Sequence, residues 1–382
     1  MNKIKLGDVL EVKRGMSLPG EYYATEGDYI RLTLGNFNYP SCGWKKNVLK
    51  DNLFFTGNVR DEYILKKGDI ITPLTEQVRG LLGNTATIPE DALYIQSGDI
   101  GLIIPDETKL DKRFSYYLVS SSVVKKQLDA RSQQTKIRHT SPEAIKDCVA
   151  FIPIIKEQKK ISYLLDCINK KIENNNAIND NLLDSVQAIF RSWFVDYDPF
   201  DGVCPSNWET GCVEDIAEFF DSMRKPLSSL ERTDMERIYP YYGAVSIVDY
   251  VDDYIFDGEY LLVSEDGIYV VDENGHPLIQ HISGKFWANN HAHILKGKSG
   301  FNEDSLYLFL ANTNMAPIVT GAAQPKINQA NLKSFPITIP DSETMLKFNN
   351  IIQPFFDQRL TNESEIKKLE ALQSLLLTRL VD

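Results

Sequence analysis

The sequence predicts an α+β protein in which two globular domains are separated by two long antiparallel helices that form a coiled-coil spacer. Two observations predict this class. The chain repeats itself with an approximate two-fold relation between its halves, and each half ends in a stretch with heptad periodicity. The expected division is a globular domain, a central long helix, a second globular domain and a C-terminal long helix, over residues 1–153, 154–200, 201–340 and 341–382.

The composition is that of a folded, water-soluble protein. The 382 residues are 43% hydrophobic and 10% aromatic, which is enough for two or three domains with real cores. The N-terminus MNKIKLGDVLEVKRG lacks the apolar stretch of a signal peptide, and no apolar run approaches the roughly 18 residues of a membrane helix. Five cysteines without a CxxC pair predict reduced thiols and a cytoplasmic location.

The repeat rests on six anchors that recur in the same order, at offsets between 186 and 207 residues. The first pair is LGDVLE (6–11) and VEDIAE (213–218), and the longest is IKDCVAFIP (145–153) and LKSFPITIP (332–340). One or two such matches could arise by chance, but six in order indicate a duplication. The other pairs are GDIIT (68–72) with GEYLL (258–262), SYYL (115–118) with SLYL (305–308), TKI (135–137) with PKI (325–327), and SVQ and VD with ALQ and VD near the two helix ends.

Heptad spacing predicts which residues pair the two long helices. One polar residue stands at the middle of each seam, and if the helices pair antiparallel, Asn175 and Asn362 meet and set the register. The alternative is that both asparagines face solvent. Pro354 is expected to kink or interrupt the second helix. The predicted pairing residues are Ile161, Ile168, Asn175, Leu182 and Ile189 in the first helix, and Phe348, Phe355, Asn362, Leu369 and Leu376 in the second, with Leu164, Leu165, Ile172, Ile178, Val186, Ile351, Ile352, Ile366, Leu372 and Leu380 as neighbours.

Four stretches carry a family resemblance: 151–200, which begins FIPIIKEQKKISYLLDCINKK, TGAAQPKINQANLKSFPITIP (320–340), 239–267, and WANNHAHIL (287–295). They resemble the specificity subunits of type I restriction-modification systems. The resemblance implies two target recognition domains that each read half of a bipartite double-stranded DNA site, and two long helices that dock methyltransferase subunits. It also implies a motor-nuclease restriction subunit, with S-adenosylmethionine, ATP and Mg bound by the partner subunits and no catalysis by this chain.

The charge distribution is unusual for a DNA-binding protein, whose affinity normally rests on Lys and Arg at phosphates. The chain has a net charge of −12, and residues 205–340 alone account for −10, with only nine basic residues. Residues 1–152 carry a net charge of +2. Either the second globular domain binds something other than nucleic acid, or a partner supplies the phosphate contacts.

Candidate DNA-contact residues are those whose side chains read base edges or hold phosphates and that cluster near Gly-containing loops. The densest cluster is RSQQTKIRH (131–139), whose repeat counterpart is 321–328. A solvated loop is the alternative for this cluster, and core packing is the alternative for the two tyrosines. The candidates are Lys13, Arg14, Gln77, Arg79, Arg131, Gln133, Gln134, Lys136, Arg138, His139, Arg224, Lys225, Tyr241, Tyr242, Gln324, Lys326 and Asn328.

Two other classes of function stay open at this point. A coiled-coil scaffold that presents two protein-binding domains is favoured by the acidic second domain. An enzyme or metal site could use His281, His291 and His293 with Glu265 and Asp266, although this spacing is not that of a known zinc motif. PDETK (105–109) is too compact for a nuclease motif, and KGKSG (296–300) lacks the first glycine of a phosphate-binding loop. No metal site is predicted.

Overall fold

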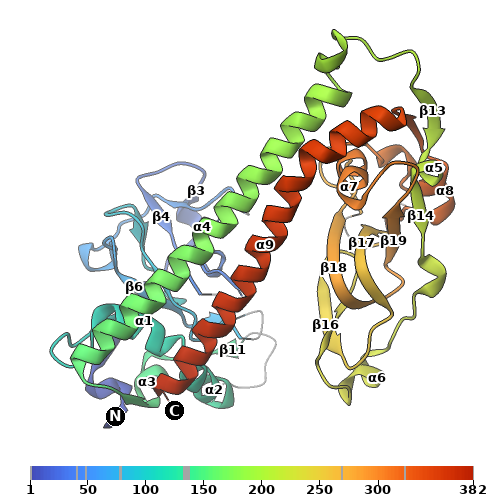
Figure 1. Ribbon diagram of the computed structural model, residues 1–382. Helices are drawn as coiled ribbons and strands as arrows, with labels where there is room; N and C mark the ends of the chain where they lie inside the picture. Colours follow the sequence, from blue (N-terminus) through green and yellow to red (C-terminus); the bar gives the residue numbers. More distant parts are fainter. Residues whose placement is uncertain are drawn as a thin grey trace. The chain divides into compact units, whose positions relative to one another are not determined.

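The computed structural model describes residues 2–39, 42–47, 50–76, 80–131, 138–267, 270–321 and 324–381. The chain forms two compact units. Unit 1 comprises residues 1–174 and 364–382, and unit 2 comprises residues 175–363. Both units combine helices with sheets (Figure 1), so the predicted α+β class is confirmed. Among the described helices, none is both long and apolar enough to cross a membrane.

The described residues of unit 1 form two four-stranded sheets and two short strand pairs. One sheet has the order β2-β10-β6-β8 and is antiparallel, and the other has the order β3-β5-β4-β9. The pairs are β1-β12 and β11-β7. The strands are β1 (Asn2–Lys5), β2 (Leu10–Arg14), β3 (Tyr23–Ala24), β4 (Tyr29–Arg31), β5 (Phe54–Phe55), β6 (Ile70–Pro73), β7 (Thr75–Glu76), β8 (Ala86–Thr87), β9 (Tyr94–Ile95), β10 (Ile100–Pro105), β11 (Arg138–His139) and β12 (Val149–Ile152).

Unit 2 is built on a six-stranded sheet of order β14-β19-β17-β18-β15-β16 and the pair β13-β20. The β17–β18 hairpin is its longest ladder and runs from Phe256↔Phe286 to Val263↔Ile279. The strands are β13 (Glu209–Cys212), β14 (Ala217–Phe219), β15 (Tyr239–Tyr242), β16 (Ile247–Val251), β17 (Phe256–Ser264), β18 (Ile279–Ala288), β19 (Ala292–Gly297) and β20 (Pro336–Ile339).

Short helices in both units begin where the sequence offers a capping side chain. Asp111 accepts a hydrogen bond from the Phe114 amide at the start of the first helix of unit 1, and Asn302 forms a capping box with Ser305 in unit 2. Ser141 and Asn328 cap the helices that precede β12 and β20. The helices are α1 (Lys112–Val119), α2 (Ser122–Arg131), α3 (Pro142–Lys146), α5 (Val213–Ile216), α6 (Ser229–Thr233), α7 (Glu303–Ala311) and α8 (Gln329–Lys333).

The repeat in the sequence corresponds to a repeat in the structure. Each copy opens on a strand that pairs antiparallel with the strand that closes it, β1 with β12 in unit 1 and β13 with β20 in unit 2. A short capped helix, α3 or α8, precedes each closing strand. The FIP and TIP anchors are therefore the ends of strands whose partners lie at the beginning of each copy.

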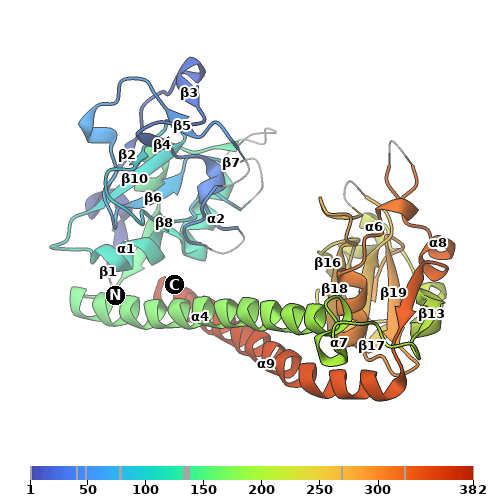
Figure 2. The same cartoon turned by 90° about the horizontal axis from the view of Figure 1, so that it is seen from above.

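Two helices of 40 residues follow the closing strands, α4 (Ile155–Phe194) and α9 (Ser342–Val381). α4 ends at Phe194 and not at Phe200 as predicted, because Tyr197 adopts a left-handed conformation with φ 56° and a 3-10 helix with Pro199 follows. α9 continues through Pro354. The predicted interruption was therefore wrong, although Figure 2 shows a bend in the first half of this helix.

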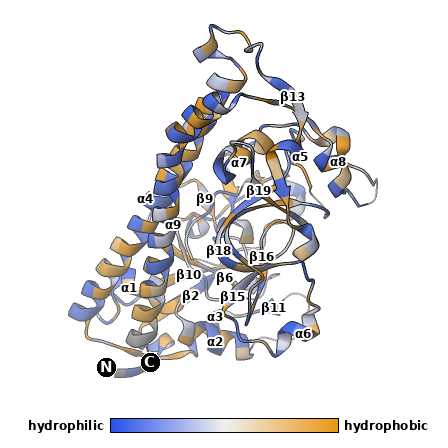
Figure 3. Ribbon diagram, turned by 45° about the vertical axis from the view of Figure 1, so that its right-hand side comes forward, coloured by the Kyte–Doolittle hydropathy of each residue, from blue (hydrophilic) through white to orange (hydrophobic). Residues whose placement is uncertain are grey.

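The two long helices contact each other in antiparallel order within each unit. In unit 1, Asn169 of α4 accepts a hydrogen bond from Gln373 of α9, and Lys171 pairs with Glu365. In unit 2, Phe190 packs against Phe348. Figure 3 shows hydrophobic and hydrophilic residues interspersed along both helices, as expected for helices with one apolar stripe.

All ten predicted pairing residues are buried or partly buried, but four of their predicted neighbours are not. Leu164, Ile178, Ile351 and Leu372 are among the exposed large hydrophobic residues of the chain. The side chain of Leu380 lies outside the described residues. The heptad count locates the centre of each stripe correctly, and the structure shows that the stripe is narrower than the sequence predicts.

The central asparagines are buried, so the alternative that they face solvent is wrong. Asn175 is 1% exposed and Asn362 is 5% exposed. The Asn362 side chain donates a 2.8 Å hydrogen bond to Asn179, one helical turn beyond Asn175, and accepts one from Gln358. The predicted contact of Asn362 with α4 therefore exists, and Asn179 is the partner that accepts its hydrogen bond.

Candidate nucleic-acid interface

The structure brings together two predicted clusters of unit 1 that are far apart in the sequence. β7 pairs with β11, which places Glu76 opposite Arg138 and Thr75 opposite His139. The Arg14 guanidinium lies 3.4 Å from the carbonyl oxygen of Thr140 and donates to it. The end of β2, the end of β7 and the strand β11 therefore form one group of loops.

The candidates in this group differ in how available they are to a ligand. Lys13, Arg14 and His139 are exposed. Arg138 is mostly buried and forms ion pairs with Glu76 at 2.9 Å and Asp129 at 2.7 Å. Five other candidates lie outside the described residues: Gln77, Arg79, Gln133, Gln134 and Lys136.

Arg131 is exposed, but its side chain forms hydrogen bonds within the protein. Its guanidinium donates to the carbonyl oxygens of Ala144 and Asp147, at 3.2 and 3.3 Å. These are carbonyls at the end of α3, where a cation satisfies otherwise unpaired acceptors. The structure therefore gives Arg131 a role at a helix C-terminus.

Glu76 organises the loop group of unit 1 and was not among the predicted residues. It is 2% exposed, and its Oε2 accepts hydrogen bonds from the amides of Gly80 and Leu82 at 3.0 and 2.9 Å. Its Oε1 forms an ion pair with the Arg138 guanidinium. Gly80 has φ 100°, a conformation that strongly favours glycine, and this places its amide toward the carboxylate.

Unit 2 has a comparable group around Glu265, which directly follows β17. The Arg224 guanidinium donates to Glu265 Oε2 at 2.6 Å, and Lys326 pairs with Oε1 at 2.9 Å. Burial raises the pKa of Glu265, but the bonds from Lys326 and Arg224 outweigh it and hold the pKa below its ordinary value. Two predicted DNA-contact residues, Arg224 and Lys326, are thus held together by one carboxylate.

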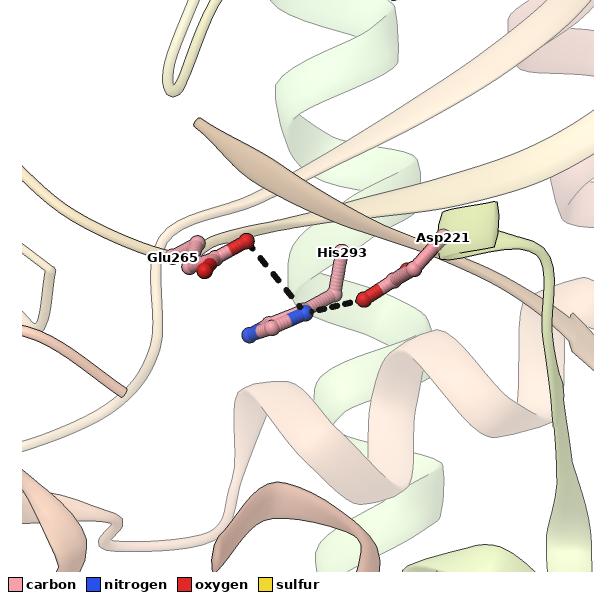
Figure 4. Close-up of side chains that lie close together, drawn as sticks. All are labelled: Asp221, Glu265 and His293. Atoms are coloured by element: carbon pink, nitrogen blue, oxygen red, sulfur yellow. Dashed lines mark hydrogen bonds and ion pairs between the residues drawn. The ribbon is translucent and has the colours of Figure 1, made fainter. Parts of the chain in front are cut away.

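His293 lies beside this group, fully buried, between Asp221 and Glu265 (Figure 4). Its Nδ1 is 2.6 Å from Asp221 Oδ2 and its Nε2 is 2.8 Å from the carbonyl oxygen of Ile327. The imidazole ring is therefore held at both nitrogens, by a carboxylate on one side and a backbone carbonyl on the other. Burial raises the pKa of Asp221, but His293, the Ile294 amide and Arg224 together lower it below the ordinary value.

The cluster of Asp221, Glu265 and His293 has ligand atoms within 4.8 Å of one another, as a metal site would. A cation already fills this position, because the Arg224 guanidinium lies 2.6 Å from Glu265 and 3.4 Å from Asp221. The other two histidines of the enzyme hypothesis contact carboxylates outside this cluster. His291 contacts Asp266, and His281 contacts Asp304. The three histidines therefore do not converge on one site.

The remaining candidates of unit 2 divide into core residues and surface residues. Tyr241 is 2% exposed, and its hydroxyl accepts a hydrogen bond from the Leu227 amide. Tyr242 packs against Phe286 in the sheet core. The structure therefore supports core packing, and not DNA contact, for both tyrosines, since neither ring is free at the surface. Asn328 caps α8, whereas Lys225 and Gln324 are exposed.

None of the five cysteines, all of which lie in the described residues, forms a disulfide in the structure. Cys148 is buried, and burial raises the pKa of its thiol to about 11. This thiol therefore stays protonated and unreactive at neutral pH.

Comparison with known proteins identifies the family. A family model described as the type I restriction modification DNA specificity domain matches residues 1–184 and again residues 205–372. A Haemophilus influenzae protein named as a putative type I restriction enzyme specificity subunit is 39% identical over 128 residues, which covers 34% of this chain and 32% of that protein. A type I restriction enzyme specificity subunit of Methanocaldococcus jannaschii is 22% identical over 304 residues, or 73% of this chain and 70% of that protein.

A solved structure shares the fold. The S subunit of a type I restriction-modification system from M. genitalium superposes with a TM-score of 0.57 at 16% identity, over 100% of this chain and 96% of that one. The two family matches coincide with the two copies of the repeat, and together they span most of the chain. The chain belongs to the family of type I restriction-modification DNA specificity subunits.

Proposed function

We propose that this chain recognises a bipartite double-stranded DNA site as the specificity subunit of a type I restriction-modification complex, with one half-site read by each unit. The observation that carries this proposal is the duplicated loop group. Each copy matched by the family model has exposed polar residues next to a buried glutamate that binds a basic side chain. Two such groups on one chain fit a DNA site made of two separate halves.

In this proposal the chain itself carries out no chemistry. The paired helices α4 and α9 act as a coiled-coil spacer, and their exposed apolar residues dock methyltransferase subunits, which bind S-adenosylmethionine. A motor-nuclease subunit supplies ATP- and Mg-dependent cleavage. Exposed apolar side chains on the helices, such as Tyr163 and Leu164 on α4 and Leu375 on α9, support a protein-docking role for this surface.

Exchange of residues 205–340 for the corresponding segment of another specificity subunit tests the proposal. The methylation pattern of cells that carry the whole system is expected to change in one half of the split site and to keep the other half. An unchanged methylation pattern would rule out a reader role for unit 2. That result would favour the scaffold hypothesis, in which the acidic segment binds a protein.

The contacts of the few basic residues in unit 2 bear on this choice. Of its nine basic residues between 205 and 340, five form ion pairs with carboxylates of the same unit: Arg224, Arg232, Arg237, Lys326 and Lys333. Lys285 and Lys296 lie over the rings of Tyr254 and Tyr260. Most cations of this unit are therefore already engaged, and few are left for phosphates.

The salt dependence of DNA binding is therefore expected to come mainly from unit 1. Removal of one cation that binds a phosphate reduces the slope of log K against log salt concentration by about 0.9. Lys13→Ala combined with Arg14→Ala should reduce the slope by nearly 2, because both cations are exposed in the loop group. Lys225→Ala in unit 2 should change it by no more than about 1.

The measurement is a titration of labelled duplex at several salt concentrations with the assembled methyltransferase complex. Arg60→Ala is the control, since Arg60 is an exposed cation that pairs with Glu62 outside the loop group. A slope that is the same for the Lys13 and Arg14 variant as for the unchanged complex would remove these residues from the interface.

A further inference from the structure

Among the residues that the structure describes, each unit carries one buried glutamate, and it lies where a strand of the core enters the candidate interface. Glu76 ends β7 and Glu265 follows β17, and they are 2% and 9% exposed. Each is preceded by a hydroxyl residue, Thr75 or Ser264. A buried carboxylate is costly unless it is fully bonded, so a buried and bonded glutamate in each unit calls for a role.

In unit 1 the Glu76 carboxylate connects two segments of the loop group. One oxygen holds the amides of Gly80 and Leu82, and the other holds the Arg138 guanidinium on β11. Gly80 and Arg138 stand at the described ends of two polar stretches that contain predicted DNA-contact residues. The single side chain of Glu76 therefore connects the Gly80–Leu82 backbone to Arg138 at the start of β11.

In unit 2 Glu265 connects three segments. Its two oxygens bind Arg224, which follows β14, and Lys326, which precedes α8. Its backbone accepts from the Ile327 amide and donates to the His291 carbonyl. The carboxylate oxygen Oε2 also lies 3.8 Å from Nδ1 of the buried His293.

Neither glutamate is placed to touch DNA itself. Both are almost inaccessible, and a carboxylate would repel phosphates. Their bonds instead hold the Gly80 and Leu82 amides and the Arg138 side chain in unit 1, and the Arg224 and Lys326 side chains in unit 2. This is the arrangement of a supporting residue that holds a recognition loop in one conformation.

We propose that Glu76 and Glu265 are positioning residues for sequence recognition, each acting on the half-site read by its own unit. The inference rests on the proposed function. It predicts that loss of either charge alters base discrimination in one half of the site and leaves the other half unchanged, because each glutamate bonds only within its own unit.

The test uses Glu76→Gln and Glu265→Gln in the full chain, assembled with its methyltransferase subunits. Binding is measured to the duplex identified by the methylome and to duplexes with single base changes in either half. Glu76→Gln should reduce the ratio of cognate to altered-site affinity at least about tenfold in one half-site, with less than about a twofold change in the other. Glu265→Gln should produce the opposite pattern.

Surface glutamates provide matched controls. Glu62→Gln and Glu214→Gln remove exposed ion pairs in unit 1 and unit 2 and should leave discrimination unchanged. If Glu76→Gln fails to fold, Arg138→Lys keeps a cation at the other end of the bond and should shift discrimination in the same half-site only.

The outcomes separate this inference from the proposed function. If the unchanged complex shows no preference for one DNA sequence, the proposed function fails. If it discriminates but both variants discriminate as well as it does, or lose both half-sites equally, the glutamates are structural residues only and the inference fails.

Discussion

Phe348→Ala is expected to lower the free energy of unfolding of unit 2 by about 3–5 kcal/mol, the range for removal of a fully buried aromatic ring. Phe348 is 0% exposed. Its ring centroid lies 4.7 Å from that of Phe194 and 5.7 Å from that of Trp193, both on α4. Truncation at this position therefore removes both buried area and aromatic contacts between α9 and α4.

The neighbourhood of Phe348 cannot collapse easily onto the cavity. Phe194 is also packed against Phe309 of α7, at 4.7 Å, and Phe190 is packed against the same ring at 5.1 Å. Because these rings belong to three helices, a shift of one of them disturbs the others. A cavity that stays open is the costly case.

Urea unfolding followed by tryptophan fluorescence measures this effect, because Trp193 lies in the cluster. Leu346→Ala is the control, since Leu346 is on the same helix and 61% exposed. The expected difference between the two variants is at least about 2 kcal/mol. Equal stabilities would mean that α9 does not depend on this cluster for its attachment in unit 2.

The seam of the long helices shows what periodicity in the sequence can predict. The residues at seven-residue intervals from Ile161 and Phe348 are buried or partly buried. They could be predicted because the repeat of a helix is a local property of the chain. The hydrogen-bond partner of Asn362 is Asn179, a residue that the count passed over. The register between the two helices depends on how their side chains pack. The period of one helix alone does not predict this register.

The candidate interface shows where prediction from residue type ends. The sequence predicts polar clusters from neighbouring residues, but Arg138 and Lys326 bind carboxylates that lie about 60 residues away in the sequence. Residue type does not distinguish a free cation from a paired one. The buried glutamates had one signal in the sequence: a Thr-Glu or Ser-Glu pair, at 75–76 and 264–265, follows an apolar strand in each copy.

Asp304→Asn is expected to stabilise unit 2 above neutral pH, although it replaces a buried charged residue. Asp304 lies in the first turn of α7, and its Oδ1 is 3.6 Å from Nδ1 of His281 on β18. Burial, followed by the charges of Glu259, Asp357 and Glu303, raises the pKa of Asp304 to about 7, and Arg359 opposes this only in part. Burial also lowers the pKa of His281 to about 4, with Arg359 acting in the same direction.

The direction of the pH effect follows from these two pKa values. The folded state binds the Asp304 proton more tightly than the unfolded state, whose carboxyl has the ordinary value of 3.8. Stability therefore falls as the pH rises from about 4 to about 7 and stays reduced above that. His281 has the opposite effect, because a folded-state pKa below 6.5 costs stability as the pH falls from 6.5 toward 4.

Asparagine cannot ionise, so Asp304→Asn removes the carboxylate contribution and leaves that of His281. The variant is expected to equal the original protein near pH 4 and to exceed it by roughly 2–4 kcal/mol at pH 8. Unfolding by urea at pH 4, 6 and 8 measures the difference, with the exposed Glu273→Gln in the same unit as control. A loss of stability that is the same at every pH would contradict this prediction. It would show that Asp304 stabilises the start of α7 through its contacts and that its ionisation does not destabilise the folded state.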